Sequence, residues 1–519
     1  MDAFLKVHAA DIAGKVETFD RLIFKGHLTA LFPAGAFTRF LHSQGVLLKD
    51  FGKFVEEVTG KLKDHAQALA AQAQRPFQYL AAPHTQRTGQ SKEDLARAIA
   101  ARDEITEGLI AIFSTVEPCL SFRVRGNRAT HRLEVVRERR KCLYLYFYLL
   151  DREFGFMHVR LQTWFPFELQ IYVNGREWLA RQLDRRGIAY ARYDNTFTQI
   201  ADLAPVPTLC RRFAHRNWPT VLNAFARRVN PVLETIARAS FGGYYWCVDQ
   251  AEYATDLMFT SRAALAAIYP DIRRMAITAF GAADVLRFLG RKLHGNFRGD
   301  VSVEMRHRPE GWCVKYRMKR NSLKIYDKAS VLRVETTINN PREFTVLREV
   351  RTGRRVSLRW LPLGKAVCSL WRFAEVGQQA NHRYLEALAQ APLQGDAVAG
   401  LDGVCRSRIV SGKRVARLNP VSAETGALFH AVLKGEHQIN GFRNRDLQRH
   451  LYAAPPGPPE EARRRTIRVS RVIAKLRGHG LLAKVPRSRL YRVTTRGVRV
   501  MGAALFYRTV GFPRALLAA

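Results

Sequence analysis

The chain has 519 residues, of which 84 are lysine or arginine and 45 are aspartate or glutamate, so its formal net charge is +39. This excess of positive charge indicates a polyanionic partner, because without one the self-repulsion would serve no purpose. Hydrophobic residues make up 47% of the chain and aromatic residues 10%, which excludes a disordered chain and leaves apolar material for several cores.

The cysteines and the lack of long apolar runs both favour a cytoplasmic protein. The seven cysteines stand singly, with no C-x-x-C pair and an odd total, which argues against a zinc finger or a disulfide framework. No run approaches the ~18 apolar residues of a membrane span, and the N-terminal sequence lacks the apolar core of a signal peptide. Arginines are spread along the whole chain, so we expect nucleic acid as the partner and no membrane.

Taken in chain order, the predicted elements give a multidomain α+β protein. Apolar residues recur at helical spacing over 36–75, and Ser91 with Asp94 has the pattern that begins a further helix. From 108 the character changes to β-branched and aromatic runs broken by turns, which predict antiparallel sheets with helices. The expected segments are a mainly helical N-terminal unit (1–107), a first α+β sheet domain (108–204), a helical segment with a four-stranded meander (205–365), a helix and linker (366–418) and a C-terminal domain (419–519).

The last hundred residues contain the pattern with the most specific mechanism. Three predicted helices, AETGALFHAVLKG, FRNRDLQRHL and EEARRRTIRVSRVIAKLRGHG, precede the predicted hairpin LLAKVPRSRLYRVTTRG. This order resembles the winged-helix DNA-binding domains of bacterial regulators, and the resemblance covers about the last fifth of the chain. It implies that the third helix enters the major groove of duplex DNA. A winged helix that binds another protein is the alternative.

The third of these helices is expected to carry most of the DNA contact. Its apolar positions can pack while its arginines reach phosphates or contact guanine bidentately. Basic residues at the tip of the hairpin would touch the DNA backbone or the minor groove. The predicted contacts are Arg464, Arg465, Arg468, Arg471 and Lys475 on the helix, and Arg487 and Arg489 on the hairpin.

A second resemblance lies in the central meander. KIYDK…LRVE, which begins at Lys324, resembles a segment of phage and plasmid rolling-circle replication initiators over about 25 residues. The resemblance implies a mobile genetic element. Those families hold a metal with two histidines placed around one hydrophobic residue, and this sequence has no such pair. Lys324 and Lys328 share one face of the predicted strand and are expected to contact nucleic acid.

Clustered carboxylates would be needed for metal-dependent cleavage, because they hold Mg²⁺ and activate water. Asp327 and Glu335 are the first candidates, as catalytic residues and as metal ligands, if a paired hairpin brings them together. Carboxylates paired with the abundant arginines are the alternative interpretation of every such group. The alternative cluster is Asp249, Glu252 and Asp256, which helical spacing would align on one stripe, and further candidates near the first sheet are Glu117, Asp151 and Glu153.

Aromatic residues of the first sheet suggest another kind of contact. Tyr144, Tyr146 and Tyr148 share one face of the predicted strand CLYLYFYLL, and Trp164 lies on the next strand. Aromatic side chains interleaved with basic groups on a sheet can stack on the unpaired bases of RNA or single-stranded DNA. An aromatic stripe packed in a core is the alternative.

The sequence therefore favours a nucleic-acid-binding protein that processes DNA for a mobile genetic element. It would act as a Mg²⁺-dependent nuclease or as a replication or recombination factor, and no motif indicates an organic cofactor. A non-enzymatic winged-helix transcription regulator is the first alternative. An RNA-binding or RNA-guided effector is the second, because arginines spread along a chain suit RNA as well as DNA.

Overall fold

The computed structural model of the chain has a mixed α+β fold and divides into two compact units. Unit 1 consists of residues 1–15, 255–336 and 378–519, and unit 2 of residues 16–254 and 337–377. Each unit is thus assembled from segments that are far apart in the sequence, whereas the five segments expected above are consecutive. The structure describes residues 1–81, 89–239, 242–278, 280–291, 301–308, 311–352, 355–389, 397–410, 412–434, 437 and 441–508.

The sheet of unit 2 is centred on a long hairpin formed by β3 and β4. The strand order is β1-β6-β5-β4-β3-β2, and neighbouring strands are antiparallel except for β2 and β3. Successive side chains of a strand point to opposite faces, and all residues from Tyr144 to Leu149 are buried, so both faces of the sheet are covered there. The strands are β1 (Ile12–His27), β2 (Phe77–Tyr79), β3 (Gly108–Asn127), β4 (Arg132–Asp151), β5 (Gly155–Gln162) and β6 (Leu169–Asn174).

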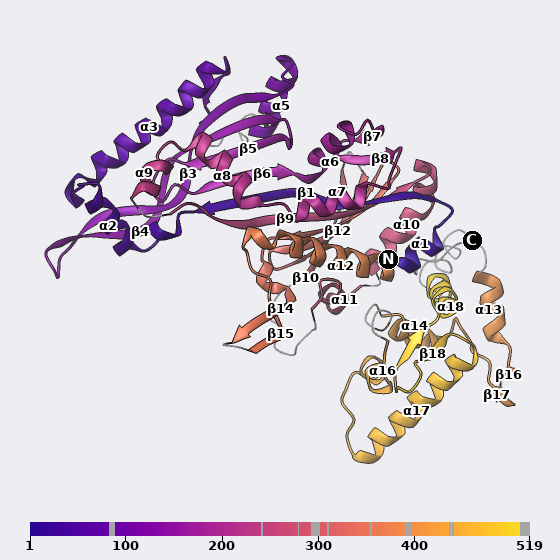
Figure 1. Ribbon diagram of the computed structural model, residues 1–519. Helices are drawn as coiled ribbons and strands as arrows, with labels where there is room; N and C mark the ends of the chain where they lie inside the picture. The colour runs from indigo at the N-terminus through magenta and orange to yellow at the C-terminus, as the bar shows by residue number, and fades with distance from the viewer. Residues whose placement is uncertain are drawn as a thin grey trace. The chain divides into compact units, whose positions relative to one another are not determined.

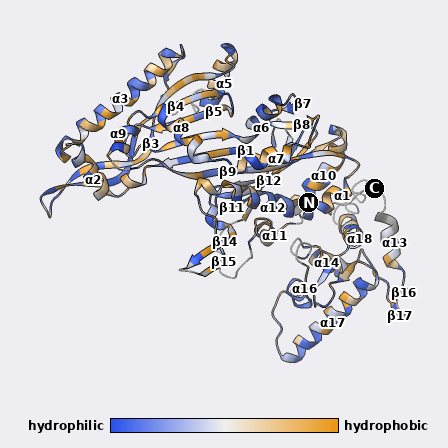
Figure 2. Cartoon of the chain, viewed as in Figure 1, coloured by the Kyte–Doolittle hydropathy of each residue, from blue (hydrophilic) through white to orange (hydrophobic). Residues whose placement is uncertain are grey.

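Helices pack on this sheet through apolar residues at helical spacing. The helix α3 (Phe51–Gln72) buries Val55, Val58, Leu62 and Ala66, and its hydrophobic and hydrophilic residues alternate along the ribbon (Figure 2). The predicted start of α5 (Lys92–Arg102) is confirmed by a capping box between Ser91 and Asp94. The remaining helices of unit 2 are α2 (Ala34–Ser43), α6 (Gly175–Asp184), α7 (Val206–Ala214), α8 (Trp218–Val229) and α9 (Leu233–Arg238), with short 3₁₀ turns at Thr29–Leu31, Leu48–Asp50, Pro341–Glu343 and Val367–Ser369.

Two hairpins of unit 2 stand apart from the large sheet. They are β7 (Tyr190–Tyr193) with β8 (Thr196–Ile200), and β14 (Thr345–Thr352) with β15 (Arg355–Pro362). Each forms a separate two-stranded sheet, and Figure 1 labels both. The two strands of each hairpin are therefore hydrogen-bonded to each other and to no strand of the main sheet.

The long strand β9 (Tyr245–Phe259) corrects the expectation of helix in this segment. Its last residues, Ala254–Phe259, are all buried, and a strand buried on both faces has no polar alternation by which sequence reasoning could recognise it. The strands β1, β9 and β13 each have residues in both units.

The predicted four-stranded meander is confirmed in unit 1, where the strand order is β10-β11-β12-β13-β9. Tyr316 of β11 lies opposite Leu323 of β12, and both are fully buried. The strands are β10 (Val301–Arg308), β11 (Gly311–Met318), β12 (Asn321–Lys328) and β13 (Val331–Ile338), and the helices of this part are α1 (Asp2–Val7), α10 (Arg262–Thr278), α11 (Ala282–Phe288) and α12 (Leu370–Leu388), the last of which begins in unit 2.

The C-terminal part of unit 1 has its own apolar core. Phe429, Phe442, Leu447, Ile473 and Leu481 are all buried in it. Among the helices of the described ranges, none is both long enough and apolar enough to cross a membrane. The elements are α13 (Ala397–Cys405), β16 (Arg408–Val410), β17 (Lys413–Val415), α14 (Ala423–Val432), α16 (Asn444–Leu451), α17 (Pro459–Gly478), β18 (Leu482–Lys484), β19 (Tyr491–Val493) and α18 (Thr495–Phe506).

Candidate nucleic-acid interface

The helix α17 separates an apolar face from a basic face. Val469, Ile473 and Leu476 point into the core and are at most 2% exposed. On the other side, four basic residues recur at positions i, i+4, i+7 and i+11, which places them on one side of a helix. We call this set the basic stripe; it consists of Arg464, Arg468, Arg471 and Lys475, of which the three arginines are exposed and the lysine is half-buried.

Neighbouring elements fix the orientation of α17. The side-chain amide of Asn444 in α16 donates to the carbonyl oxygen of Thr466 at 3.0 Å and to the hydroxyl of Ser470 at 2.8 Å. The first turn of α17 carries Glu460 and Glu461, which suit the positive end of the helix dipole. The basic stripe is therefore presented by a helix that is held along its apolar face and along one flank.

Arg465 differs from the other predicted contacts, because its side chain is held within the unit. Its guanidinium donates to Glu461 at 2.9 Å and to the carbonyl oxygen of Ala454 at 2.7 Å, and it lies 4.5 Å from the ring centre of Tyr452. Its side chain is only 16% exposed. We therefore assign Arg465 to the support of α17 rather than to an interface.

Arg468 forms an ion pair with an acidic residue, but its guanidinium remains accessible to another anion. Its guanidinium lies 2.8 Å from the carboxylate of Glu424, but both side chains are mostly exposed. An exposed ion pair of this kind contributes about 0–1 kcal/mol, so a phosphate could replace the carboxylate at little cost.

The hairpin of β18 and β19 follows α17 directly and is joined to the start of α16. The backbones of Phe442 and Tyr491 exchange two hydrogen bonds of 2.8 Å. Gly441 lies at φ +68°, and a Cβ there would stand 2.6 Å from the carbonyl oxygen of Tyr491. This close approach explains why glycine stands before Phe442, and it fixes the hairpin relative to α16.

The tip of this hairpin carries the two predicted arginines. Arg487 and Arg489 are both exposed, and Arg487 adopts the left-handed conformation at φ 53°. The turn is stabilised by Ser488, whose hydroxyl donates to the carbonyl oxygen of Val485 at 2.9 Å. Residues 482–499 contain six basic residues and no acidic one, so nothing along this segment neutralises the tip.

The carboxylates predicted to bind metal in the central meander are held apart, Glu335 by a lysine and Asp327 by a backbone N–H group. Lys324 lies 2.5 Å from Glu335, and both are in the interior. Residues 324 and 327 point to opposite faces of β12, so Asp327 lies on the face away from Glu335. Asp327 accepts a hydrogen bond from the backbone of Trp312, and burial raises the pKa of its carboxyl above the ordinary value. The expected Asp327–Glu335 site is therefore not formed.

The second predicted carboxylate cluster is also dispersed. In the strand β9, Asp249 points to the face opposite Glu252 and Asp256, so the helical stripe expected from the sequence was wrong. Asp256 accepts hydrogen bonds from Arg333 at 2.8 and 3.1 Å, and both residues are fully buried. Among the described residues, no group of three or more metal-ligating side chains comes together.

The meander lysines and the tyrosines of the first sheet lie inside the units. Lys328 is buried and Lys324 faces Glu335, so neither presents its ammonium group as an interface would require. The three tyrosines pack under α5 with Ala96 and Ile99, and are at most 8% exposed. The stacking prediction was therefore wrong for Tyr144, Tyr146 and Tyr148, while Trp164 is half-buried with Arg140 at 4.8 Å from its ring centre.

Glu117 is part of a polar network beneath α5. The carboxylate accepts hydrogen bonds from Tyr146, Lys92 and Arg160 at 2.6–2.7 Å. Burial alone would raise the pKa of this carboxyl, but Lys92 and Arg160 lower it below the ordinary value. Glu117 is therefore a half-buried anion that ties Lys92 of α5 to the sheet.

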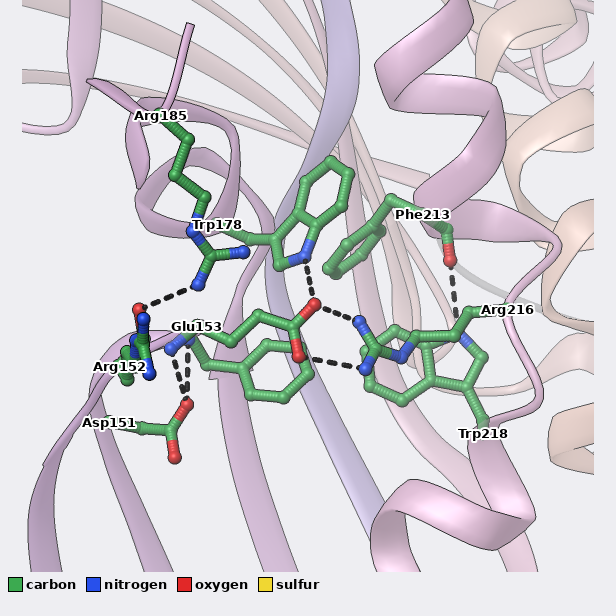
Figure 3. A network of polar contacts seen from close by, with 9 residues as sticks. Asp151, Arg152, Glu153, Trp178, Arg185, Phe213, Arg216 and Trp218 are labelled. Carbon is green, nitrogen blue, oxygen red and sulfur yellow. Dashed lines mark hydrogen bonds and ion pairs between the residues drawn. The ribbon is translucent and has the colours of Figure 1, made fainter. Parts of the chain in front are cut away.

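A pocket of about 410 Å³ in unit 2 escaped the sequence analysis. Figure 3 shows the Glu153 carboxylate between the indole of Trp178, which donates at 3.2 Å, and the guanidinium of Arg216, which donates at 2.7 Å. Burial opposes ionisation here, but these donors lower the pKa of Glu153, so the carboxylate is a fixed anion and a poor general base. Arg212 and His215 complete the lining. No sequence spacing indicates this pocket, because its residues come from three separate segments of the chain.

Comparisons of the chain with protein-family models, with curated proteins and with solved structures gave no match. The case for a function therefore depends on the geometry of the chain itself.

Proposed function

We propose that this chain is a DNA-binding protein whose C-terminal part, from residue 419, is a winged-helix domain that contacts duplex DNA. The observation that carries the proposal is the basic stripe on α17, which lies opposite the buried residues Val469, Ile473 and Leu476. The order of α14, α16, α17 and the β18–β19 hairpin supports it, because a winged helix has three helices followed by a wing.

The dimensions of α17 suit this role. The four residues of the stripe extend over roughly 16 Å of helix, at about 1.5 Å per residue. The major groove of B-DNA, about 12 Å wide, admits one α-helix, and arginine side chains can reach both its base edges and its phosphates. Arg487 and Arg489, at the tip of the hairpin, would contact the adjacent backbone.

Our proposal for the wider role is DNA processing for a mobile genetic element, with a non-enzymatic transcription regulator as the alternative. Both roles use the same duplex contact. Metal-dependent cleavage is the weaker part, because Glu335 and Asp256 are held by Lys324 and Arg333. Incubation of the purified chain with supercoiled plasmid and Mg²⁺ separates the two roles: cutting that EDTA abolishes supports processing, and intact plasmid favours the regulator.

The duplex contact itself is tested by reversing the charge of the stripe. We expect R468E/R471E/K475E to weaken binding of a 25-base-pair duplex by at least about tenfold, because three phosphate contacts are replaced by repulsion. Fluorescence anisotropy measures the dissociation constant.

The matched control is K49E/K53E/K63E, which makes the same change in net charge at exposed lysines of unit 2. It should bind within about threefold of the wild type, since only the general field changes. Equal weakening by both variants would mean that α17 has no special part in the contact, and unchanged binding by the stripe variant would remove the winged-helix interface.

A further inference from the structure

The β14–β15 hairpin exposes large apolar side chains to solvent. Trp360 is 69% exposed, Leu358 64% and Val356 59%, although most such residues of the chain are buried. Of the seven tryptophans, all of which the structure describes, Trp360 alone is exposed. A contiguous apolar patch on a separate hairpin is unusual for a soluble surface and indicates a contact site.

The register shows that these side chains share one face. Leu347 lies opposite Trp360, and Glu349 lies opposite Leu358. Because side chains alternate along each strand, Leu347, Trp360 and Leu358 point to the same side of the hairpin. The exposed Arg351, opposite Val356, lies at the end of this face. The face thus has Trp360 and Leu347 at one end, Leu358 beside the exposed carboxylate of Glu349 in the middle, and Val356 beside the guanidinium of Arg351 at the other end.

Charge decides which kind of partner suits this face. Residues 345–362 include five arginines and one glutamate, so the hairpin carries a formal charge of +4. A second copy of the hairpin would bring this charge against itself, whereas a phosphate backbone would neutralise it. The exposed Arg359 precedes Trp360 in the strand and points to the opposite face, so the hairpin presents positive charge on that face as well.

We propose that this face binds single-stranded nucleic acid, with Trp360 stacked on a base and the hairpin arginines along the phosphates. Base stacking needs an accessible aromatic face and is tolerant of sequence, because every base has a π-face. A base paired within a duplex does not expose this surface. The contact is therefore separate from the duplex contact proposed for α17 and adds a second kind of nucleic acid as ligand.

The test replaces Trp360 in the full chain and measures binding of 15-nucleotide oligo(dT) and oligo(U) by fluorescence anisotropy. We expect W360A to raise the dissociation constant by about tenfold for both probes, in line with the effect of removing one stacked base. W360F should stay within about threefold of the wild type, because phenylalanine still stacks. Y193A is the matched control, since Tyr193 is also exposed on a two-stranded hairpin of unit 2, and it should bind as the wild type does.

Tryptophan fluorescence gives an independent readout. The difference between the emission of the wild type and that of W360F is the emission of Trp360. Oligo(dT) should quench this difference. Equal affinity of W360A and wild type, or no quenching of this emission, would overturn the proposal. Concentration-dependent dimerisation that W360A abolishes in sedimentation experiments would also overturn it, and would make a second copy the partner.

Oligo(dT) binding with and without W360A, measured in the R468E/R471E/K475E variant, tests the two proposals separately. If the hairpin binds a single strand, W360A still weakens oligo(dT) binding there, whatever the stripe variant does to duplex DNA. A stripe variant that binds duplex normally would contradict the winged-helix proposal alone.

Discussion

At the residue scale, the stability of the fold should depend strongly on the ion pair of Asp256 and Arg333. Both residues are fully buried, and the guanidinium donates two hydrogen bonds to the carboxylate. We expect D256A to lower the free energy of unfolding by roughly 3–5 kcal/mol, because the buried guanidinium would lose the carboxylate to which it donates two hydrogen bonds. Urea denaturation followed by circular dichroism measures the change.

The exposed i,i+4 pair of Glu234 and Arg238 is the control for this variant. E234A should change stability by no more than about 0.5 kcal/mol. An equally small effect of D256A would contradict the burial of the Asp256–Arg333 pair.

His158 should make unit 2 sensitive to acid. Burial lowers the pKa of its imidazole to about 3, and nearby Arg21, Arg160 and Lys92 act in the same direction. The unfolded chain therefore binds a proton at His158 below pH 6.5, whereas the folded chain binds it only near pH 3. The neutral ring contributes stability above pH 6.5 that is lost as the pH falls from 6.5 towards 3, on the order of 5 kcal/mol in total.

The variant H158Q isolates this effect from that of the carboxylates, which titrate in an overlapping range. Urea midpoints between pH 4 and 7.5 should fall less steeply for H158Q than for the wild type. Parallel pH profiles would contradict the lowered pKa of His158, because they would show that folding does not change its proton binding.

Contacts between residues that are close in sequence could be predicted, and contacts between distant residues could not. The capping box of Ser91 and Asp94 is confirmed because both members lie within one turn of helix. Arg333 is 77 positions from Asp256, so no spacing pattern joins them. The general alternative, that carboxylates pair with abundant cations, describes Asp256 and Glu335 correctly.

At the element scale, the packing of α18 against Leu481, the residue directly before β18, depends on one glycine. A Cβ at Gly497 would stand 2.0 Å from the carbonyl oxygen of Leu481, far inside van der Waals contact. We expect G497A to destabilise the C-terminal core by at least about 2 kcal/mol, because the backbone must move apart. Limited proteolysis should then cut the C-terminal part earlier than in the wild type.

Gly60 provides the control, because it lies inside α3 and a Cβ there meets nothing within 4 Å. G60A should stabilise α3 by up to about 1 kcal/mol, the difference in helix propensity between the two residues. Resistance of G497A to protease equal to that of the wild type would contradict the close packing of Gly497.

Elements with a clear period were predicted, and elements buried on both faces were not. In the meander β10–β13, β-branched and aromatic runs are separated by short turns. Four strands were therefore expected, and four are found. The strand β9 is buried on both faces near Phe259 and was expected to be helical. The tyrosine stripe of β4 was identified as one face, but α5, which covers it, lies in a different segment of the sequence.

At the scale of the whole molecule, the charge is the property that the sequence determines most directly. The net charge of +39 is the same whatever the fold of the chain. Which of the basic side chains can reach a partner depends on which of them the fold leaves exposed. Lys328 is buried and Lys324 is paired with Glu335, whereas Arg464, Arg468 and Arg471 are exposed. The two discontinuous units could not be read from composition, because each draws on segments of similar character.

The central claim is that the basic stripe of α17 neutralises DNA phosphates. The most direct test measures the affinity for duplex DNA from 50 to 300 mM salt for the wild type and for R468E/R471E/K475E. Each phosphate contact contributes about 0.9 to the slope of log K against log [salt], so the wild type should have a slope steeper by about 2–3. Parallel lines with the same slope would contradict the claim, because they would show that α17 releases no counterions when the chain binds.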